Sequence, residues 1–164
     1  MRLSGITQES FVDGPGVRFV IFTQGCPHKC PNCHNPDSWK KNAGKEFSTR
    51  QIVRLLKKQK NTRRGVTFSG GEPFLQSAEL LEVAKEAREI DMDVVTYTGF
   101  TYEQLLEEGD EDTKALLDAS DILIDGKYLH ECRDIALPFR GSTNQRVIDV
   151  KESRKCGRVV LWSA

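Results

Sequence analysis

The amino-acid sequence predicts one α/β domain over residues 1–164, folded as a partial, open (β/α) barrel. Apolar, β-branched runs typical of buried strands alternate along the chain with amphipathic stretches typical of helices. This alternation favours a mainly parallel sheet with right-handed crossovers. A complete eight-unit barrel usually takes about 250 residues, whereas this chain has 164. We therefore expect a barrel that does not close.

The strands are predicted from short apolar runs that turn residues interrupt. The runs expected to form strands are residues 19–23, 65–69, 92–97, 122–124 and 147–150. The tail, residues 157–162, indicates either a terminal strand or an edge that binds a partner.

Capping residues mark where two of the helices begin. Ser48 is followed three residues later by Gln51, and Thr101 by Gln104, which is the capping-box pattern. An apolar stripe at helical spacing predicts a helix over residues 77–89, beginning at Ser77. A further helix is expected over residues 113–119.

The composition is that of an ordinary globular domain. Lys plus Arg and Asp plus Glu both number 24, so no bulk charge attracts nucleic acid or an anionic membrane. No apolar run approaches the roughly 20 residues that span a bilayer, and the amino terminus lacks a signal core. We expect a cytoplasmic protein without nucleic-acid or membrane partners. A basic group near residues 57–64 indicates a solvated helix end, or a docking face for an acidic electron donor.

Three of the five cysteines are crowded into the cysteine loop, residues 26–33. These loop cysteines are Cys26, Cys30 and Cys33, in the spacing Cys-x-x-x-Cys-x-x-Cys. Such crowding favours metal chemistry over a disulfide framework. The remote cysteines, Cys132 and Cys156, have no comparable neighbours and are expected to be buried free thiols.

Two metal sites fit the cysteine loop. Iron–sulfur clusters are normally held by four thiolates, so a four-iron cluster on three leaves one iron open to another ligand. Alternatively, the loop cysteines with His28 or His34 could form a tetrahedral structural zinc site. A zinc-stabilised binding module without activity is thus an alternative to an iron–sulfur enzyme.

Two further motifs flank strands. The turn 13–16, Asp-Gly-Pro-Gly, precedes the first expected strand, and the cysteine loop leaves that strand's end. Gly70-Gly71-Glu72-Pro73 follows the second, where glycine lets the backbone approach a ligand and Glu72 could accept a hydrogen bond from an ammonium group. Sites collect at the carboxyl ends of parallel strands, which is where the cysteine loop leaves the first expected strand.

These motifs resemble those of known enzymes. The three-cysteine loop followed by Gly-Gly-Glu-Pro is similar to the radical S-adenosylmethionine superfamily, and the turn 13–16 resembles activating enzymes of glycyl radical enzymes. The segments 125–128 (Asp-Gly-Lys-Tyr) and 140–146 (Arg-Gly-Ser-Thr-Asn-Gln-Arg) resemble the anaerobic (class III) ribonucleotide reductase activating proteins. The pyruvate formate-lyase activating enzymes are similar in the first half but longer.

The resemblance implies a partial barrel of the radical S-adenosylmethionine type, with a 4Fe-4S cluster on the loop cysteines and S-adenosyl-L-methionine as second cofactor. Asn32 and His34 would lie against the nucleoside, and Gly70, Gly71 and Glu72 at the methionine end. Weaker roles near the same ligand fall to Thr96, Arg140 and Ser142.

The resemblance also implies a reaction. A flavodoxin-like donor would supply one electron, S-adenosylmethionine would be cleaved, and a hydrogen atom would leave a glycine of anaerobic ribonucleoside-triphosphate reductase, giving a glycyl radical. No catalytic residue beyond the cluster is expected, since no general acid or base is needed. A radical enzyme acting on a small molecule with the same scaffold is the alternative within this class.

Overall fold

The computed structural model describes residues 1–164 as one open seven-stranded sheet with helices packed on it, in the strand order β3-β1-β2-β4-β5-β6-β7. The strands are β1 (Arg2–Ser10), β2 (Arg18–Thr23), β3 (Lys45–Glu46), β4 (Gly65–Gly70), β5 (Asp93–Tyr97), β6 (Ile122–Asp125) and β7 (Arg146–Asp149). The α-helices are α1 (Thr49–Lys57), α2 (Ser77–Glu89), α3 (Tyr102–Glu108), α4 (Glu111–Ala119) and α5 (Val150–Cys156). Short 3₁₀ helices are η1 (Pro36–Trp39), η2 (Pro73–Gln76) and η3 (His130–Cys132).

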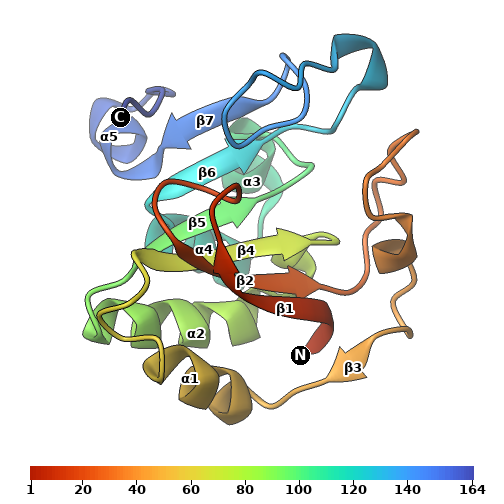
Figure 1. Ribbon diagram of the computed structural model, residues 1–164. Helices are drawn as coiled ribbons and strands as arrows, with labels where there is room; N and C mark the ends of the chain where they lie inside the picture. The colour runs from red at the N-terminus through yellow and green to blue at the C-terminus, as the bar shows by residue number, and fades with distance from the viewer.

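The centre of the sheet is parallel, as the sequence predicts. β2, β4, β5 and β6 pair in parallel, whereas β1 and β3 on one side and β7 on the other are antiparallel. The sheet has two free edges, so the barrel stays open and the predicted fold class is confirmed (Figure 1). None of the helices combines the length and the apolar character that a bilayer crossing requires.

Side chains alternate between the two faces of the sheet. The large core of 22 buried residues lies between the sheet and the helices and includes Val66, Phe68 and Val94. Figure 1 shows α1, α2 and α4 against this face. On the opposite, concave face the small cluster around Val95 and Ile124 packs against partly buried aromatic side chains. The concave face therefore stays accessible to ligands.

The predicted helix starts agree with the structure. Ser48 and Gln51 form a reciprocal capping box at α1, and Thr101 and Gln104 form another at α3. α2 covers the expected residues 77–89. α4 begins two residues earlier than expected, because the side chain of the preceding aspartate accepts a hydrogen bond from the third helical N–H.

The carboxyl-terminal third differs from the prediction. The expected strand 147–150 ends at Asp149, whose carboxylate caps α5 at the backbone N–H of Glu152 (2.9 Å), so Val150 is helical. The tail is not a strand: it makes one isolated bridge, between Ile148 and Leu161. The expectation of buried remote cysteines is wrong for Cys156, which is exposed at the end of α5.

The turn 13–16 is held by a buried arginine at the amino ends of the strands. Arg18 is fully buried and donates to Pro15 O (2.9 Å), to Thr67 Oγ1 (2.6 Å) and to Val66 O (2.9 Å). Its guanidinium also pairs with Asp93 at 2.6 Å. These contacts fold the β1–β2 connection over the concave face.

Candidate metal centre

A cavity of about 660 Å³ opens on the concave face, within the size range of small-molecule sites. It is lined from the carboxyl ends of β2, β4 and β5 and from the connections that follow β2 and β6. All three loop cysteines line it, and neither remote cysteine does. The cysteine loop and the glycines that end β4 thus line the same cavity at the carboxyl ends of the strands.

The cysteine loop reverses direction through two left-handed residues, Lys29 (φ 48°) and Asn32 (φ 59°). Its start is tied down by a hydrogen bond from Cys26 N to Trp39 O (3.2 Å). Burial raises the pKa of the Cys26 and Cys30 thiols. Because metals bind thiolates, loading this site must release protons.

The donor set fits an iron–sulfur cluster with one open iron. Three half-buried thiols face one cavity, and no fourth thiol lines it. No three His, Cys, Asp or Glu side chains are gathered around a single-ion position. His28, one of the two candidate zinc ligands, directs its Nε2 at Glu72 (2.7 Å). His34 lies beside the Tyr128 ring, with centroids 4.9 Å apart.

Gly70 and Gly71 line the cavity where β4 ends. Gly70 has φ 97°, and a Cβ there would collide with the backbone of Thr23. A Cβ on Gly71 would collide with the carbonyl oxygen of Gly25, which immediately precedes the cysteine loop. Glycine is thus required for backbone packing against the end of β2 at position 70 and against the segment that follows β2 at position 71, a reason the sequence alone did not reveal.

Glu72 lies elsewhere than its expected role requires. It is fully buried and does not line the cavity. Oε1 accepts from Phe74 N (3.1 Å) and Thr98 Oγ1 (2.9 Å), and Oε2 accepts from Gly99 N (2.9 Å) and contacts His28 Nε2. The carboxylate is saturated by protein donors, so the expected hydrogen bond from a ligand's ammonium group has no acceptor atom free to receive it.

Three other predicted cofactor contacts do not reach the cavity. Thr96 points to the helical face, opposite its neighbour Tyr97, and its hydroxyl pairs with that of Ser120 at 2.8 Å. Ser142 is fully buried, and its hydroxyl accepts from a backbone N–H within its own loop region. Asn32 is exposed on the cysteine loop and directed away from the lining. Strand alternation and loop geometry account for the positions of all three side chains, and their roles at the cofactor stay predictions.

His34 and Arg140 do line the cavity. Arg140 donates from Nη1 to Gln145 O at 2.6 Å, while its buried Nε has no partner. A buried guanidinium N–H without an acceptor beside a cavity fits a ligand that carries an anionic or hydroxyl oxygen. S-adenosylmethionine has both, so this part of the cavity fits the expected second cofactor.

Sequence reasoning missed the aromatic part of the wall. Its members include Phe22, Trp39, Tyr97, Tyr128 and Phe139. The Tyr97 hydroxyl donates to Phe139 O, and burial is the main reason that the pKa of Tyr97 lies far above its ordinary value. Alternation within the predicted strand 92–97 could have placed Tyr97 on the concave face; nothing local marks the others.

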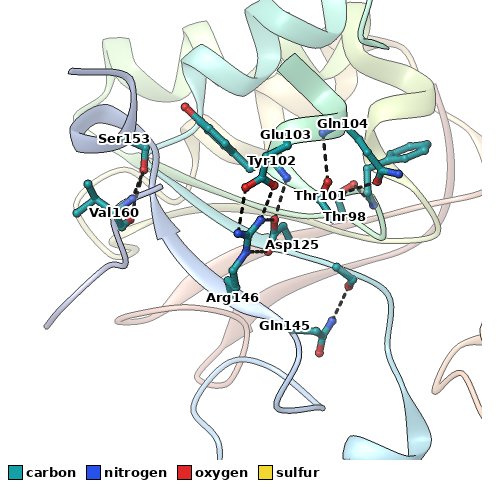
Figure 2. A network of polar contacts seen from close by, with 12 residues as sticks. Thr98, Thr101, Tyr102, Glu103, Gln104, Asp125, Gln145, Arg146, Ser153 and Val160 are labelled. Atoms are coloured by element: carbon teal, nitrogen blue, oxygen red, sulfur yellow. Dashed lines mark hydrogen bonds and ion pairs between the residues drawn. The ribbon is translucent and has the colours of Figure 1, made fainter. Parts of the chain in front are cut away.

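A polar network behind the cavity fixes the turn after β6 (Figure 2). Asp125, buried at the end of β6, accepts from Tyr102 N (2.8 Å) and from Arg146 Nε (3.0 Å). Arg146 also pairs with Glu103 at 2.7 Å, and this hydrogen bond lowers the pKa of Glu103. The network holds the neighbouring Gly126 and Lys127 at the cavity wall.

The open α/β sheet and the three-thiol cavity define a class: an iron–sulfur protein with a single, incompletely ligated cluster. The family described as "4Fe-4S single cluster domain" matches residues 12–148, and the chain belongs to that family. Because the family is described by a 4Fe-4S cluster, its membership excludes the alternative of a zinc-stabilised binding module.

Similarity to individual relatives narrows the family to which the chain belongs. An anaerobic ribonucleoside-triphosphate reductase-activating protein from Haemophilus influenzae is 38% identical over 141 residues, covering 82% of this chain and 88% of that protein. The Vibrio cholerae protein of the same name is 35% identical over 142 residues, with the same coverage. A pyruvate formate-lyase-activating enzyme from Clostridium pasteurianum is 37% identical over 133 residues, covering 76% of this chain but 55% of that enzyme. The chain therefore belongs to the anaerobic ribonucleoside-triphosphate reductase-activating proteins, and the resemblance drawn from its motifs is confirmed.

Proposed function

We propose that this chain activates an anaerobic ribonucleoside-triphosphate reductase by generating a glycyl radical on it. The observation that carries the proposal is the convergence of three thiols, without a fourth, on one cavity at the carboxyl ends of the parallel strands. The hydrogen atom would leave a glycine Cα of the reductase, and the electron that this chemistry requires would come from an external donor.

Each group of cavity residues has one proposed role, holding either the cluster or S-adenosylmethionine. We assign Cys26, Cys30 and Cys33 to the 4Fe-4S cluster, and His34, Gly70, Gly71 and Arg140 to S-adenosylmethionine. When bound, the cluster and this cofactor supply the one-electron cleavage and hydrogen-abstraction chemistry. The protein orients them and excludes water with the aromatic wall.

The mouth of the cavity supports a protein substrate. Three side chains there are exposed although apolar: Phe11 (66%), Val12 (73%) and Ile135 (85%). Exposed apolar groups gathered at one place mark interaction sites. A radical reaction also needs a site closed to solvent. We propose that the glycine-bearing segment of the reductase covers this mouth and completes the closure.

The electron donor is proposed by class alone. A flavodoxin-like protein can deliver single electrons, but the basic group expected to dock it is partly neutralised. Lys57 pairs with Glu86 (2.9 Å), and Arg63 pairs with Glu9 (2.9 Å). These pairs favour a solvated face over a docking face. A cytoplasmic location belongs to the same proposal, supported by five free cysteines and no disulfide, as a reducing compartment requires.

The test is anaerobic reconstitution with iron and sulfide, followed by reduction in the presence of S-adenosylmethionine and the reductase. We expect a glycyl radical doublet in electron paramagnetic resonance, absent when the reductase's radical glycine is replaced by alanine. A doublet that never forms, with rapid turnover of a free small molecule instead, would establish the small-molecule radical enzyme.

Surface variants test whether the reductase docks at the mouth of the cavity. The double variant Phe11→Ser, Val12→Ser should lower the yield of glycyl radical, because it removes apolar contact area from the docking face. Leu161→Ser is the matched control: Leu161 is 62% exposed but lies outside the cavity. Equal radical yields from both variants would contradict docking at this mouth.

A further inference from the structure

The cysteine loop is held by one buried side chain of its own. The His28 side chain is only 6% exposed, whereas Pro27, Lys29, Pro31 and Asn32 of the same loop are exposed residues. The partner of this ring, Glu72, has no exposed surface. A buried carboxylate is costly unless donors satisfy it, so the contact between His28 and Glu72 is a required part of this structure.

The pocket for His28 is shaped to the ring. A Cβ on Gly99 would collide with the imidazole, so position 99 must be glycine for the ring to lie there. Phe100 packs edge-on against His28, with ring centroids 4.6 Å apart and planes at 75°. Both residues follow β5, so the ring anchors the cysteine loop to a different strand from the one that the loop leaves.

Glu72 contacts the loop on both sides of Cys26. Its backbone N–H donates to the carbonyl oxygen of Gly25 at 2.8 Å, directly before Cys26. Its carboxylate oxygen lies 2.7 Å from Nε2 of His28, two residues after Cys26. The same carboxylate accepts from Thr98 and Gly99 at the end of β5. One rigidly held residue thus fixes the backbone on either side of the first loop cysteine.

We propose that Glu72 and His28 are positioning residues that hold Cys26 in place for the cluster, and that Glu72 does not bind the second cofactor. We name this contact the His28–Glu72 clamp. The inference rests on the cluster site of the proposed function, and it does not depend on which substrate the enzyme activates. Groups that orient a metal ligand typically change metal affinity about 10–100-fold when they are removed.

The test compares His28→Ala, Glu72→Gln and the double variant by the rate at which a chelator removes iron under anaerobic conditions. We expect about 10–100-fold faster loss from each single variant. The double variant should lose iron no faster than the singles, because each single already breaks the same contact. Gly99→Ala displaces the imidazole without deleting a polar group and should behave like His28→Ala.

Two controls separate this effect from general damage. Lys29→Asn changes an exposed residue of the same loop and tolerates the left-handed backbone there, so it should retain iron as the parent does. Circular dichroism of the metal-free variants should show the parent's secondary structure. S-adenosylmethionine affinity of Glu72→Gln, measured on protein carrying full iron, should stay within about twofold of the parent, since Glu72 does not line the cavity whereas His28 does.

The opposite pattern overturns the proposal. If Glu72→Gln keeps its iron but loses S-adenosylmethionine affinity, while His28→Ala is normal, Glu72 is a cofactor ligand. Iron loss that is additive in the double variant would show that the two residues act separately. The clamp variants can lose iron at the expected rates while the parent forms no glycyl radical on the reductase. That outcome would refute the proposed substrate but not the role of the His28–Glu72 clamp.

Discussion

Replacing Arg18 with methionine should destabilise the protein far more than replacing Arg64 with methionine, although both arginines bind the same carboxylate. Arg18 Nη2 lies 2.6 Å from Asp93 Oδ1 with its side chain fully buried. Arg64 Nε lies 3.0 Å from Asp93 Oδ2 with 51% of its side chain exposed. Burial lowers the pKa of Arg18, and Asp93 acts against that shift. The two sites therefore form a matched comparison of buried and exposed pairing.

The size of the stability loss depends on which groups each substitution leaves without a partner. Arg18→Met removes the buried partner of Asp93 and the donors to the carbonyls of Pro15 and Val66. Breaking a buried pair costs about 3–5 kcal/mol. For a chain of this size that corresponds to a melting temperature roughly 6–20 °C lower. Arg64→Met removes a pair open to solvent, worth about 0–1 kcal/mol.

The assay is thermal unfolding of the metal-free protein, followed by circular dichroism under reducing conditions. Native-state hydrogen exchange should also show faster exchange in the turn 13–16 of Arg18→Met, because the hydrogen bond to Pro15 O is lost. Equal shifts in the two variants, or a loss below about 1 kcal/mol for Arg18→Met, would show that burial does not decide the strength of these pairs.

Three more outcomes are expected. The parent should bind about four irons per chain; alanine at any loop cysteine should abolish iron binding and cofactor cleavage, and alanine at either remote cysteine should not. Gly71→Val should lose iron and S-adenosylmethionine affinity together, since its side chain would displace Gly25; normal iron content would contradict this. The lowered pKa of Glu103 contributes stability above the unfolded value near 4.5, lost as pH falls through the folded pKa. The difference in urea unfolding between Glu103→Gln and the parent should be largest at pH 6 and shrink as the pH falls below 4.5.

The parallel strands and the helix starts could be predicted because their signals are local. Apolar runs identify β2, β4, β5 and β6, and a side chain three residues from a backbone N–H defines each capping box. The three thiols of the cysteine loop are equally local, although the spacing alone leaves open whether a histidine joins them at a zinc ion. These features need no knowledge of distant contacts.

The features that were missed depend on distant partners. β1 is largely polar and half-exposed, and it forms a strand because β2 and β3 supply its hydrogen bonds. Thr96 was expected at a ligand, but the register of β5 turns it toward Ser120 on α4's side of the sheet. Glu72 was expected at the cofactor, but donors from beyond β5 reach it first. In each case a residue far along the chain decides the outcome.

Two of the buried charges, Arg18 and Glu72, lie at opposite ends of the parallel strands. Arg18, at the amino ends, holds the turn 13–16 across the concave face. Glu72, at the carboxyl ends, holds the cysteine loop beside the same cavity. An open sheet lacks the strands that would otherwise wall a barrel, so connections between strands must form the wall. Buried charges suit this task because each demands several fixed donors or acceptors, and those partners come from connections that apolar packing alone would leave mobile. The short chain thus builds a rigid site from loops by burying one charge at each end of its strands.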